Sequence, residues 1–446
     1  GEATGRRFEG ADGDTDKLVG EAAEAIYAQT QPYRYAIWQD SHGQQADALA
    51  KFEWLARHGL PEDQPWAYAG WSAALQQRGD FEGGASVVRE GLRRGLQLYD
   101  SGALNNLSIS ENALARFDAL ATARGVEEEI RRTGRGFGTL SRDAALENIE
   151  GSIAGRLGDY RAVIDLWGRD SGFNVEGRAV NVRALLGRDL VADHDVAAGL
   201  RLSDPTSEGL FSFRGLNYGF YSDRMKAALA LHDWPSVVAM GQKTFSLAAS
   251  DPRTRQFAFR EDAAILAAGY ARIGRLADAQ AMLGKTLLDC ESCLAARGWV
   301  AELAGDHAEA DHWFATFERA DPDLPLPNAE WAQALLERGD LNRAIAKARQ
   351  AHRTSSHYAE PMETWGDALM AKGDYAGAAG KFTEADKDAP RWGRNHMRWG
   401  EALMLSGRYP EARAQFVTAS GMDLSSPDRA ALSVLLARTA SGPLHG

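Results

Sequence analysis

Small and apolar residues recur at a fixed step over residues 291–424. Every unit of this pattern contains a Gly, and successive glycines are 34 residues apart: Gly305, Gly339, Gly373 and Gly407. A small residue stands seven positions before each Gly, and an Ala stands five positions after it. These positions hold Gly298, Ala332, Gly366 and Gly400, then Ala310, Ala344, Ala378 and Ala412. Apolar residues at helical spacing on both sides of a Gly turn predict two helices per unit, packed closely through the small residues.

An aromatic residue strengthens the same register. Trp331, Trp365 and Trp399 are each followed four residues later by a Leu. The pattern resembles the tetratricopeptide repeat (TPR) family, in its bacterial type with degenerate N-terminal repeats. The resemblance implies an all-α, right-handed α-solenoid of helical hairpins that ends in a capping helix.

Looser copies of the turn occur earlier in the chain. They are Gly79-Asp80-Phe81, Gly158-Asp159-Tyr160, His232-Asp233-Trp234 and Gly274-Arg275-Leu276. Their spacing is irregular, so we expect the first two intervals to hold extra, degenerate helix pairs. The expected helices span 111–124, 126–132, 175–186 and 191–202. Helices are also expected over 44–58, 66–77 and 81–96.

Four segments follow from these patterns. Residues 1–40 would form a polar lead-in and a first helix that Pro32 ends. Residues 41–290 would form irregular TPR-like hairpins, and 291–424 the four regular repeats. Residues 425–446 would form a capping helix and tail, because the run Ser425-Ser426-Pro427-Asp428 places a Ser at the cap and a Pro at the first helical position.

Composition narrows the classes of partner. The net charge of −12 disfavours nucleic acid, whose phosphates require clustered Lys and Arg. We found no run of 18 apolar residues that could span a membrane. The chain begins with Gly1, which suggests a cleaved or truncated product with a segment missing upstream. We expect a cytoplasmic protein, or a periplasmic one if an upstream signal or anchor has been removed.

Few residues suggest catalytic or metal chemistry. Cys290 and Cys293 form a CxxC pair at the expected start of a helix, so they are a candidate redox pair, with structural packing and partial metal binding as alternatives. The run Asp193-His194-Asp195 has metal-ligating residue types but no distant fourth ligand. We found no nucleotide-binding or hydrolase motif, so we predict no enzyme, no metal and no cofactor.

The TPR resemblance points to a binding surface. In that family the first helix of each hairpin lines a concave groove. The groove residues expected here are Trp299, Glu302, Gln333, Glu337, Glu363, Asp367, Met370, Arg394, Met397 and Glu401. Acidic residues outnumber the one Arg, and the Lys, Asn and Arg with which some family members clamp a carboxylate are missing. We therefore expect an acidic groove, with Glu363 and Asp367 exposed, that suits a basic or amphipathic segment. The alternative is an acidic face that only meets solvent.

These observations favour a non-enzymatic scaffold for protein–protein interaction. It would form the C-terminal part of a larger signalling or membrane-anchored protein. The alternative is a solenoid that senses a small molecule in an aromatic pocket near 211–221. The aromatic residues there are Phe211, Phe213, Tyr218, Phe220 and Tyr221. Their other interpretation is a packing seam between two segments of the solenoid.

Overall fold

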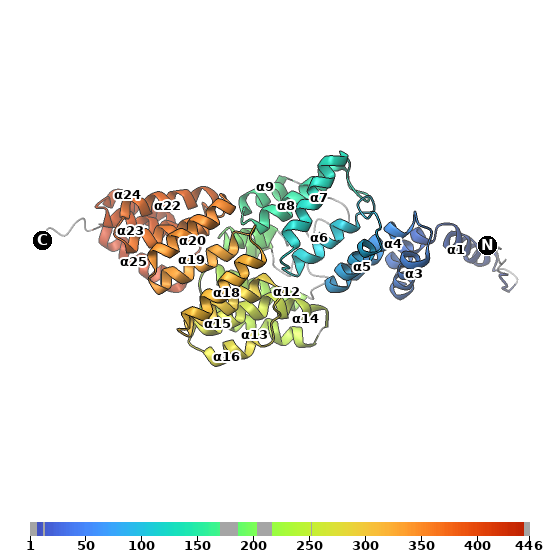
Figure 1. Ribbon diagram of the computed structural model, residues 1–446, viewed down its shortest axis with the longest axis horizontal. Helices are drawn as coiled ribbons and strands as arrows, with labels where there is room; N and C mark the ends of the chain where they lie inside the picture. Colours follow the sequence, from blue (N-terminus) through green and yellow to red (C-terminus); the bar gives the residue numbers. More distant parts are fainter. Residues whose placement is uncertain (1–6, 12–13, 170–185, 203–215, 251, 441–446) are drawn as a thin grey trace. The chain divides into compact units, whose positions relative to one another are not determined.

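The computed structural model describes residues 7–11, 14–169, 186–202, 216–250 and 252–440. Throughout these residues the regular secondary structure is helical and contains no strand (Figure 1). The predicted all-α class is therefore confirmed. The chain divides into two compact units, Gly1–Ser110 with Glu129–Ala145, and Glu111–Glu128 with Leu146–Gly446. The predicted division at residues 40, 290 and 424 stays a prediction. Among the described residues, no helix has the length and apolar character needed to cross a membrane.

The first unit is built from antiparallel helix pairs. Its helices are α1 (Thr15–Thr30), α2 (Pro32–Ser41), α3 (Gln45–His58), α4 (Gln64–Gln77) and α5 (Phe81–Arg93). Two further helices, α6 (Ala103–Ala113) and α7 (Ala119–Thr133), each contribute residues to both units. Pro32 ends α1 as predicted, but it also begins α2, because the first turn of a helix needs no proline N–H. The helices predicted over 44–58 and 66–77 are confirmed as α3 and α4, and the one predicted over 81–96 is α5, which ends earlier, at Arg93.

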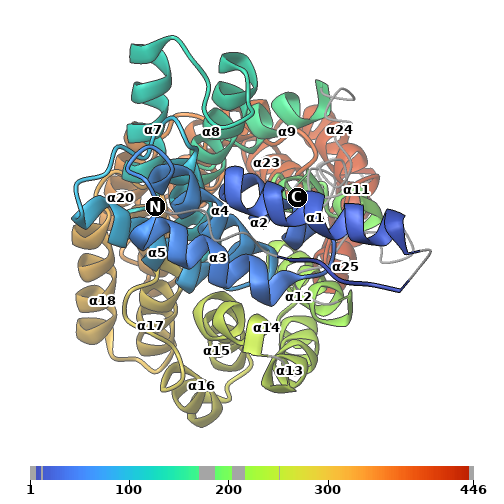
Figure 2. The same ribbon diagram turned by 90° about the vertical axis from the view of Figure 1, so that its right-hand side faces the viewer.

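The second unit continues with helices of similar length. Before the regular repeats these are α8 (Arg142–Arg156), α9 (Tyr160–Arg169), α11 (Val196–Leu202), α12 (Leu216–Ala230), α13 (Trp234–Ser250), α14 (Pro252–Phe257), the π-helix η1 (Ala258–Asp262), α15 (Ala263–Arg272) and α16 (Leu276–Leu283). The regular repeats are α17 (Glu291–Leu303), α18 (His307–Ala320), α19 (Leu326–Arg338), α20 (Leu341–Thr354), α21 (Glu360–Ala371), α22 (Tyr375–Asp388), α23 (Gly393–Leu405) and α24 (Tyr409–Ser420). Figure 2 shows α17 beside α18, the arrangement that each later pair repeats.

One turn joins the two helices of each regular repeat. Gly373 has φ +81°, a left-handed conformation that glycine adopts without strain. The next residue, Asp374, caps α22 by accepting a hydrogen bond from Gly377 N–H at 2.9 Å. Asp306 and Asp340 cap α18 and α20 in the same way. The Gly-Asp signature therefore ends one helix and begins the next.

The same turn is present at positions where the sequence hides it. Ala115 and His194 are non-glycine residues with positive φ, at +48° and +64°, as is His232, at +55°, in a turn that the sequence did predict. Ala115 lies 36 residues after Gly79, and His194 lies 36 residues after Gly158, so this turn recurs at a step close to 34 residues.

These hidden turns correct two predicted helix limits. A helix pair over 111–124 and 126–132 is wrong, because α6 ends at Ala113 and α7 runs through residue 125 without a break. The helix expected from residue 191 begins at Val196 instead, after the His194 turn. The helix expected over 175–186 lies almost wholly outside the described residues.

The array ends in the predicted capping helix, α25 (Ser426–Ala440). Ser425 Oγ accepts a hydrogen bond from Asp428 N–H at 3.2 Å and donates one to the Asp428 carboxylate at 2.8 Å. Leu432 and Leu435 are buried against the last repeat, where they join Phe416 and Leu424. The helix therefore covers the apolar face that the last repeat would otherwise expose.

Candidate functional site

The ten predicted groove residues lie on the first helices of the regular repeats, α17, α19, α21 and α23. Five are buried, namely Trp299, Glu302, Glu363, Asp367 and Met397. Gln333, Met370, Arg394 and Glu401 are half-buried, and Glu337 is exposed. The expectation that Glu363 and Asp367 are exposed is wrong, since they are 5% and 7% exposed. Whether the ten residues bind a partner stays a prediction.

Arginines from the following repeat explain this burial. Arg394 Nε donates to Glu363 Oε1 at 3.1 Å, and Arg398 Nε donates to Asp367 Oδ1 at 2.7 Å. In each pair the donor lies 31 residues after the acceptor. Arg398, which also pairs with Glu401, was not among the predicted groove residues. The predicted excess of acidic over basic groove residues therefore omits Arg398, a cation that faces these carboxylates.

Hydrogen bonds with the same spacing continue along the first helices. Trp299 Nε1–H donates to Glu330 Oε2 at 2.5 Å, and Thr364 Oγ1–H donates to Gln333 Oε1 at 3.1 Å. We call these four contacts, 299–330, 333–364, 363–394 and 367–398, the first-helix ladder. Each links one repeat to the next, so the ladder fixes the relative placement of neighbouring first helices.

The first repeats of the ladder carry a second set of ion pairs. Arg338 Nε donates to Glu302 Oε1 at 3.1 Å and Nη2 to Asp311 Oδ1 at 3.0 Å. Arg272 donates to Glu337 at 2.9 Å, and its guanidinium carbon lies 4.2 Å from the centre of a Trp299 ring. Glu337 is thus exposed but already paired. The predicted groove carboxylates are therefore paired with arginines, and the acidic character of the groove stays a prediction.

Burial changes the proton affinity of several carboxylates on or beside the ladder. It raises the pKa of Glu363 to about 7, and the nearby Asp367 carboxylate adds to the rise, whereas Arg394 and Arg398 oppose it. Burial also raises the pKa of Glu401 and of Glu330. These shifts follow from removing the carboxylates from water.

No protein-family model and no curated protein sequence matches the chain. Among solved structures, yeast Tom70 is similar with a TM-score of 0.42 and 11% identity, over 96% of this chain and 96% of that one. The Cut9–Hcn1 hetero-tetramer of the APC/C gives a TM-score of 0.43 and 11% identity, over 96% and 88%. PilF of Pseudomonas aeruginosa gives 0.34 and 16%, over 40% of this chain and 83% of that chain.

The paired helices, the 34-residue step, the Gly-Asp turns and the first-helix ladder decide the fold. This is a TPR-type helical solenoid. The predicted resemblance and fold class are confirmed at that level, whereas the bacterial type stays a prediction.

Two earlier turns of the chain pack against the regular repeats. The His194 ring stacks on Trp392 with ring centres 3.8 Å apart, and His194 Nε2 lies 3.2 Å from Glu360 Oε1. Tyr358 lies against Gly158, so that a Cβ placed on Gly158 would stand 2.4 Å from Tyr358 Cδ2. We call these contacts, between the turns at Gly158 and His194 and the starts of α21 and α23, the seam.

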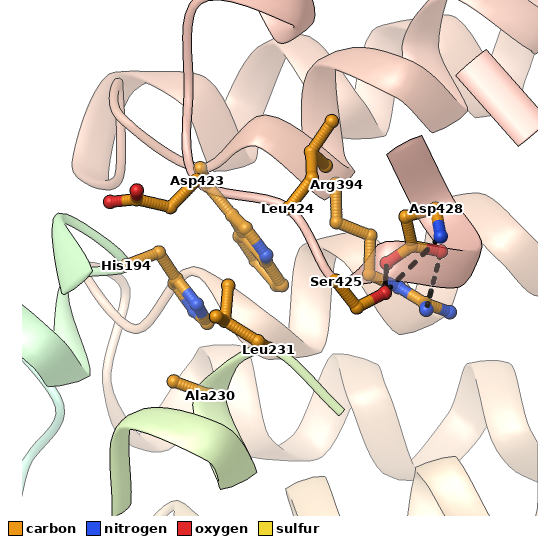
Figure 3. A pocket seen from close by; sticks show the side chains of 9 residues that line it. His194, Ala230, Leu231, Arg394, Asp423, Leu424, Ser425 and Asp428 are labelled. Carbon is orange, nitrogen blue, oxygen red and sulfur yellow. Dashed lines mark hydrogen bonds and ion pairs between the residues drawn. The ribbon is translucent and has the colours of Figure 1, made fainter. Parts of the chain in front are cut away.

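The seam continues toward α25 and is nearly filled there. Figure 3 shows His194, Ala230 and Leu231 on one side and Asp423, Leu424 and Ser425 on the other. The cavity that these residues line measures about 10 Å³, room for a single water at most. Ala197 N–H donates to Asp423 Oδ2 at 2.8 Å close by.

The residues with metal-like types at 193–195 belong to this seam. Asp195 caps α11 by accepting from Ala198 N–H at 3.4 Å, and His194 is the left-handed turn residue. Burial raises the pKa of Asp193 to about 7. Nowhere in the described ranges do three or more His, Cys, Asp or Glu side chains lie in an arrangement that could hold a metal ion.

The two cysteines lie where α17 begins. Cys290 is its N-cap residue, and it forms a disulfide with Cys293. Both sulfurs are fully buried, 3.3 and 3.2 Å from the backbone oxygen of Arg260 in η1. The redox role predicted for the pair stays a prediction.

The aromatic segment lies only partly within the described residues. Phe211 and Phe213 fall outside them. Tyr218 is buried and donates its hydroxyl to Asp262, which also accepts from Ser222 Oγ at 2.9 Å. Phe220 and Tyr221 contact each other edge to face at 5.2 Å between ring centres. These described members pack within α12 and against η1, and the ligand pocket stays a prediction.

Proposed function

We propose that the chain is a non-enzymatic scaffold that binds a protein partner along the concave row of first-helix side chains. The observation that carries the proposal is the division of that row into a fixed base and an accessible edge. Trp299, Glu302, Glu363, Asp367 and Met397 are buried and hold the base.

The accessible edge supplies the binding groups. Gln333 and Met370 are half-buried and Glu337 is exposed, so a partner can reach them without moving the array. Side chains held on rigid helices lose little conformational freedom on binding, which favours affinity. Met370 adds an adaptable apolar contact.

The partner that fits is a basic or amphipathic segment. Glu337 and Glu401 keep part of their carboxylates accessible, even though Arg272 and Arg398 pair with them. A basic partner group can share or displace these arginines, whereas an acidic group would meet like charge. Placement within a larger signalling or membrane-anchored protein also stays a prediction.

Affinity capture tests this proposal. Bait protein would carry Gln333→Lys with Met370→Lys, which adds two charges at accessible groove positions. The matched control, Leu405→Lys with Val417→Lys, adds the same charge at exposed apolar positions outside the predicted row. Proteins captured from the host would be identified and then rebound as purified proteins.

The proposal expects at least one purified partner that binds the wild type and the control but binds the groove variant about tenfold more weakly or worse. A partner whose affinity is the same for all three baits would show that binding takes place elsewhere. Circular dichroism of each variant establishes that the fold is retained.

A further inference from the structure

A second concavity lies in the same unit, away from the first-helix ladder. It is a cleft of about 480 Å³ where the turn before α7 faces the loops before α17 and α19. Its walls include Phe117, Asp118, Leu120, Asp289, Asp321 and Asp323. The volume lies in the range of cavities that enclose a side chain or a small ligand.

The cleft lies beside a third turn of the same kind, where no aromatic side chain fills the space as it does in the seam. At the Gly158 turn the neighbouring loop supplies Tyr358, and at the His194 turn it supplies Trp392. The residue 34 positions before Tyr358 is Leu324, which is smaller and packs inward with Leu120.

The corresponding turn is at Ala115, and it also contacts the later repeats. Its carbonyl accepts a hydrogen bond from Glu291 N–H at 3.2 Å. The backbone contact is therefore kept, but no aromatic ring from the loop before α19 fills the space beside it.

The chemistry of the cleft is apolar at its base and acidic at its edge. Four aspartates and one arginine, Arg116, line it together with Phe117, Leu120 and Pro322. Asp323 and Asp289 have side chains that are 69% and 45% exposed.

Most of these carboxylates also contact arginines at the rim. Arg124 pairs with Asp323 at 2.9 Å, whereas Arg116 and Arg260 pair with Asp289 at 3.4 and 3.0 Å. Arg124 is itself 43% exposed, so an incoming cation can replace it at little cost.

Asp321 is a separate indication that the cleft receives a donor. It is only 4% exposed, and its Oδ2 accepts no hydrogen bond. The nearest cation, Arg156 Nη2, is 3.9 Å away, too far for one. A buried carboxylate oxygen with no donor is costly, and a ligand donor entering the cleft would supply what it lacks.

We propose that this cleft binds an arginine or lysine side chain carried by a peptide segment of a protein partner. The aliphatic stem packs on Phe117 and Leu120, and the charged end donates toward Asp321 and Asp323. Leu287 and Leu288, 45% and 60% exposed, directly precede Asp289 and offer apolar contact to residues next to the basic one. The proposal rests on the scaffold function above and gives it a second, chemically defined contact.

Fluorescent hexapeptides test the proposal. Each would have a central Leu-Xaa pair, where Xaa is Arg, Lys, citrulline or Glu. Citrulline keeps the shape of arginine without its charge. Binding would be measured by polarisation to the wild type, to Asp321→Asn with Asp323→Asn, to Phe117→Ala, and to the charge-matched control Glu411→Gln with Asp278→Asn, whose carboxylates are half exposed elsewhere.

The expected result is that the Arg and Lys peptides bind the wild type about tenfold or more tightly than the citrulline and Glu peptides. Both cleft variants should lose about tenfold in affinity for the Arg peptide, and the control should stay within about twofold. Equal binding of the Arg and citrulline peptides, or an equal loss in the control, would overturn the proposal.

Spermidine is the comparison for a small cation. If it displaced the Arg peptide at a concentration equal to the peptide's own Kd, the cleft would be a polyamine site, and the peptide assignment would be wrong. Capture that responds to the groove variant but not to the cleft variants would leave the scaffold function standing and remove only this second contact.

Discussion

Gly366 and Phe382 are in direct contact across the third regular repeat. A Cβ placed on Gly366 would stand 2.6 Å from Phe382 Cε1, closer than real Cβ atoms approach a ring. Gly298 with Phe314 and Gly400 with Phe416 repeat the arrangement. In the second repeat the two positions hold Ala332 and Ala348, both fully buried. A glycine thus occurs where the facing residue is Phe, and an alanine where it is Ala.

Replacing Gly366 with Ala should therefore destabilise the array. Phe382 is fully buried, so its ring cannot move away without disturbing its neighbours, and overpacking of this kind costs about 1–3 kcal/mol. Urea unfolding followed by circular dichroism measures the change. Gly380→Ala is the matched control, because it lies in α22 with nothing within 4 Å of the new Cβ. It should gain about 0.5–1 kcal/mol from helix propensity. Equal effects in the two variants would contradict the packing explanation.

Reversing the charges of Glu363 and Asp367 should unfold part of the array rather than merely alter its surface. Both side chains are buried opposite Arg394 and Arg398, so two lysines there would place four cations together away from water. Breaking a buried ion pair costs about 3–5 kcal/mol, and like-charge repulsion adds to that.

Thermal and urea unfolding of Glu363→Lys with Asp367→Lys check this prediction. The control, Glu309→Lys with Glu411→Lys, changes the net charge equally at exposed positions and should lower the unfolding midpoint much less, because losing a first-turn carboxylate costs only about 0.3–1 kcal/mol. If the two double variants unfolded at the same midpoint, the buried pairing would be refuted.

The sequence predicted the regular repeats well because their turns carry a local signature. Gly305, Gly339 and Gly373 each need a left-handed conformation, and the Asp after each supplies a cap, so two adjacent residues report the turn. The turns at Ala115 and His194 have the same backbone conformation without glycine. Tertiary contacts hold these residues in place, such as the stacking of His194 on Trp392, and no local pattern in the sequence reveals such a contact.

The candidate site was harder to predict than the fold. Register placed Glu363 and Asp367 correctly on a first helix, but it could not show that arginines 31 residues later would bury them. The spacing of 31 rather than 34 arises because the contact joins offset positions in neighbouring repeats. A search of the sequence for opposite charges at that offset would have found Glu363–Arg394 and Asp367–Arg398.

Two buried aspartates, Asp193 and Asp321, should make the free energy of unfolding depend on pH. Burial raises the pKa of Asp193 and of Asp321 to about 7 in the folded protein. Arg161 opposes the rise at Asp193, where Glu360, Asp195 and Asp388 reinforce it. At Asp321 the Glu291 and Asp323 carboxylates reinforce the rise, and Arg156 and Arg124 oppose it.

The unfolded chain releases these protons near pH 4, whereas the folded chain keeps them up to about pH 7. Each group therefore stabilises the folded state most below about pH 4, and that contribution is lost as the pH rises to about 7. The slope is at most about 1.4 kcal/mol per pH unit for each group. Urea titrations from pH 5 to 8 should show a shallower fall for Asp193→Asn and Asp321→Asn than for the wild type. Identical slopes in all three proteins would show that these carboxyls ionise normally.

The disulfide between Cys290 and Cys293 should resist reduction in the native protein. Both sulfurs are fully buried between the start of α17 and the Arg260 carbonyl. An attacking thiolate has to reach a sulfur directly, so reduction requires this end of α17 to open first. Timed exposure to dithiothreitol, followed by gel-shift labelling with a maleimide polymer, compares the native and urea-unfolded protein. We expect labelling of the native protein to be at least about tenfold slower. Cys290→Ser with Cys293→Ser gives the labelling background. Equal rates in the two states would mean that the pair is accessible in the folded array, which is what a redox role requires.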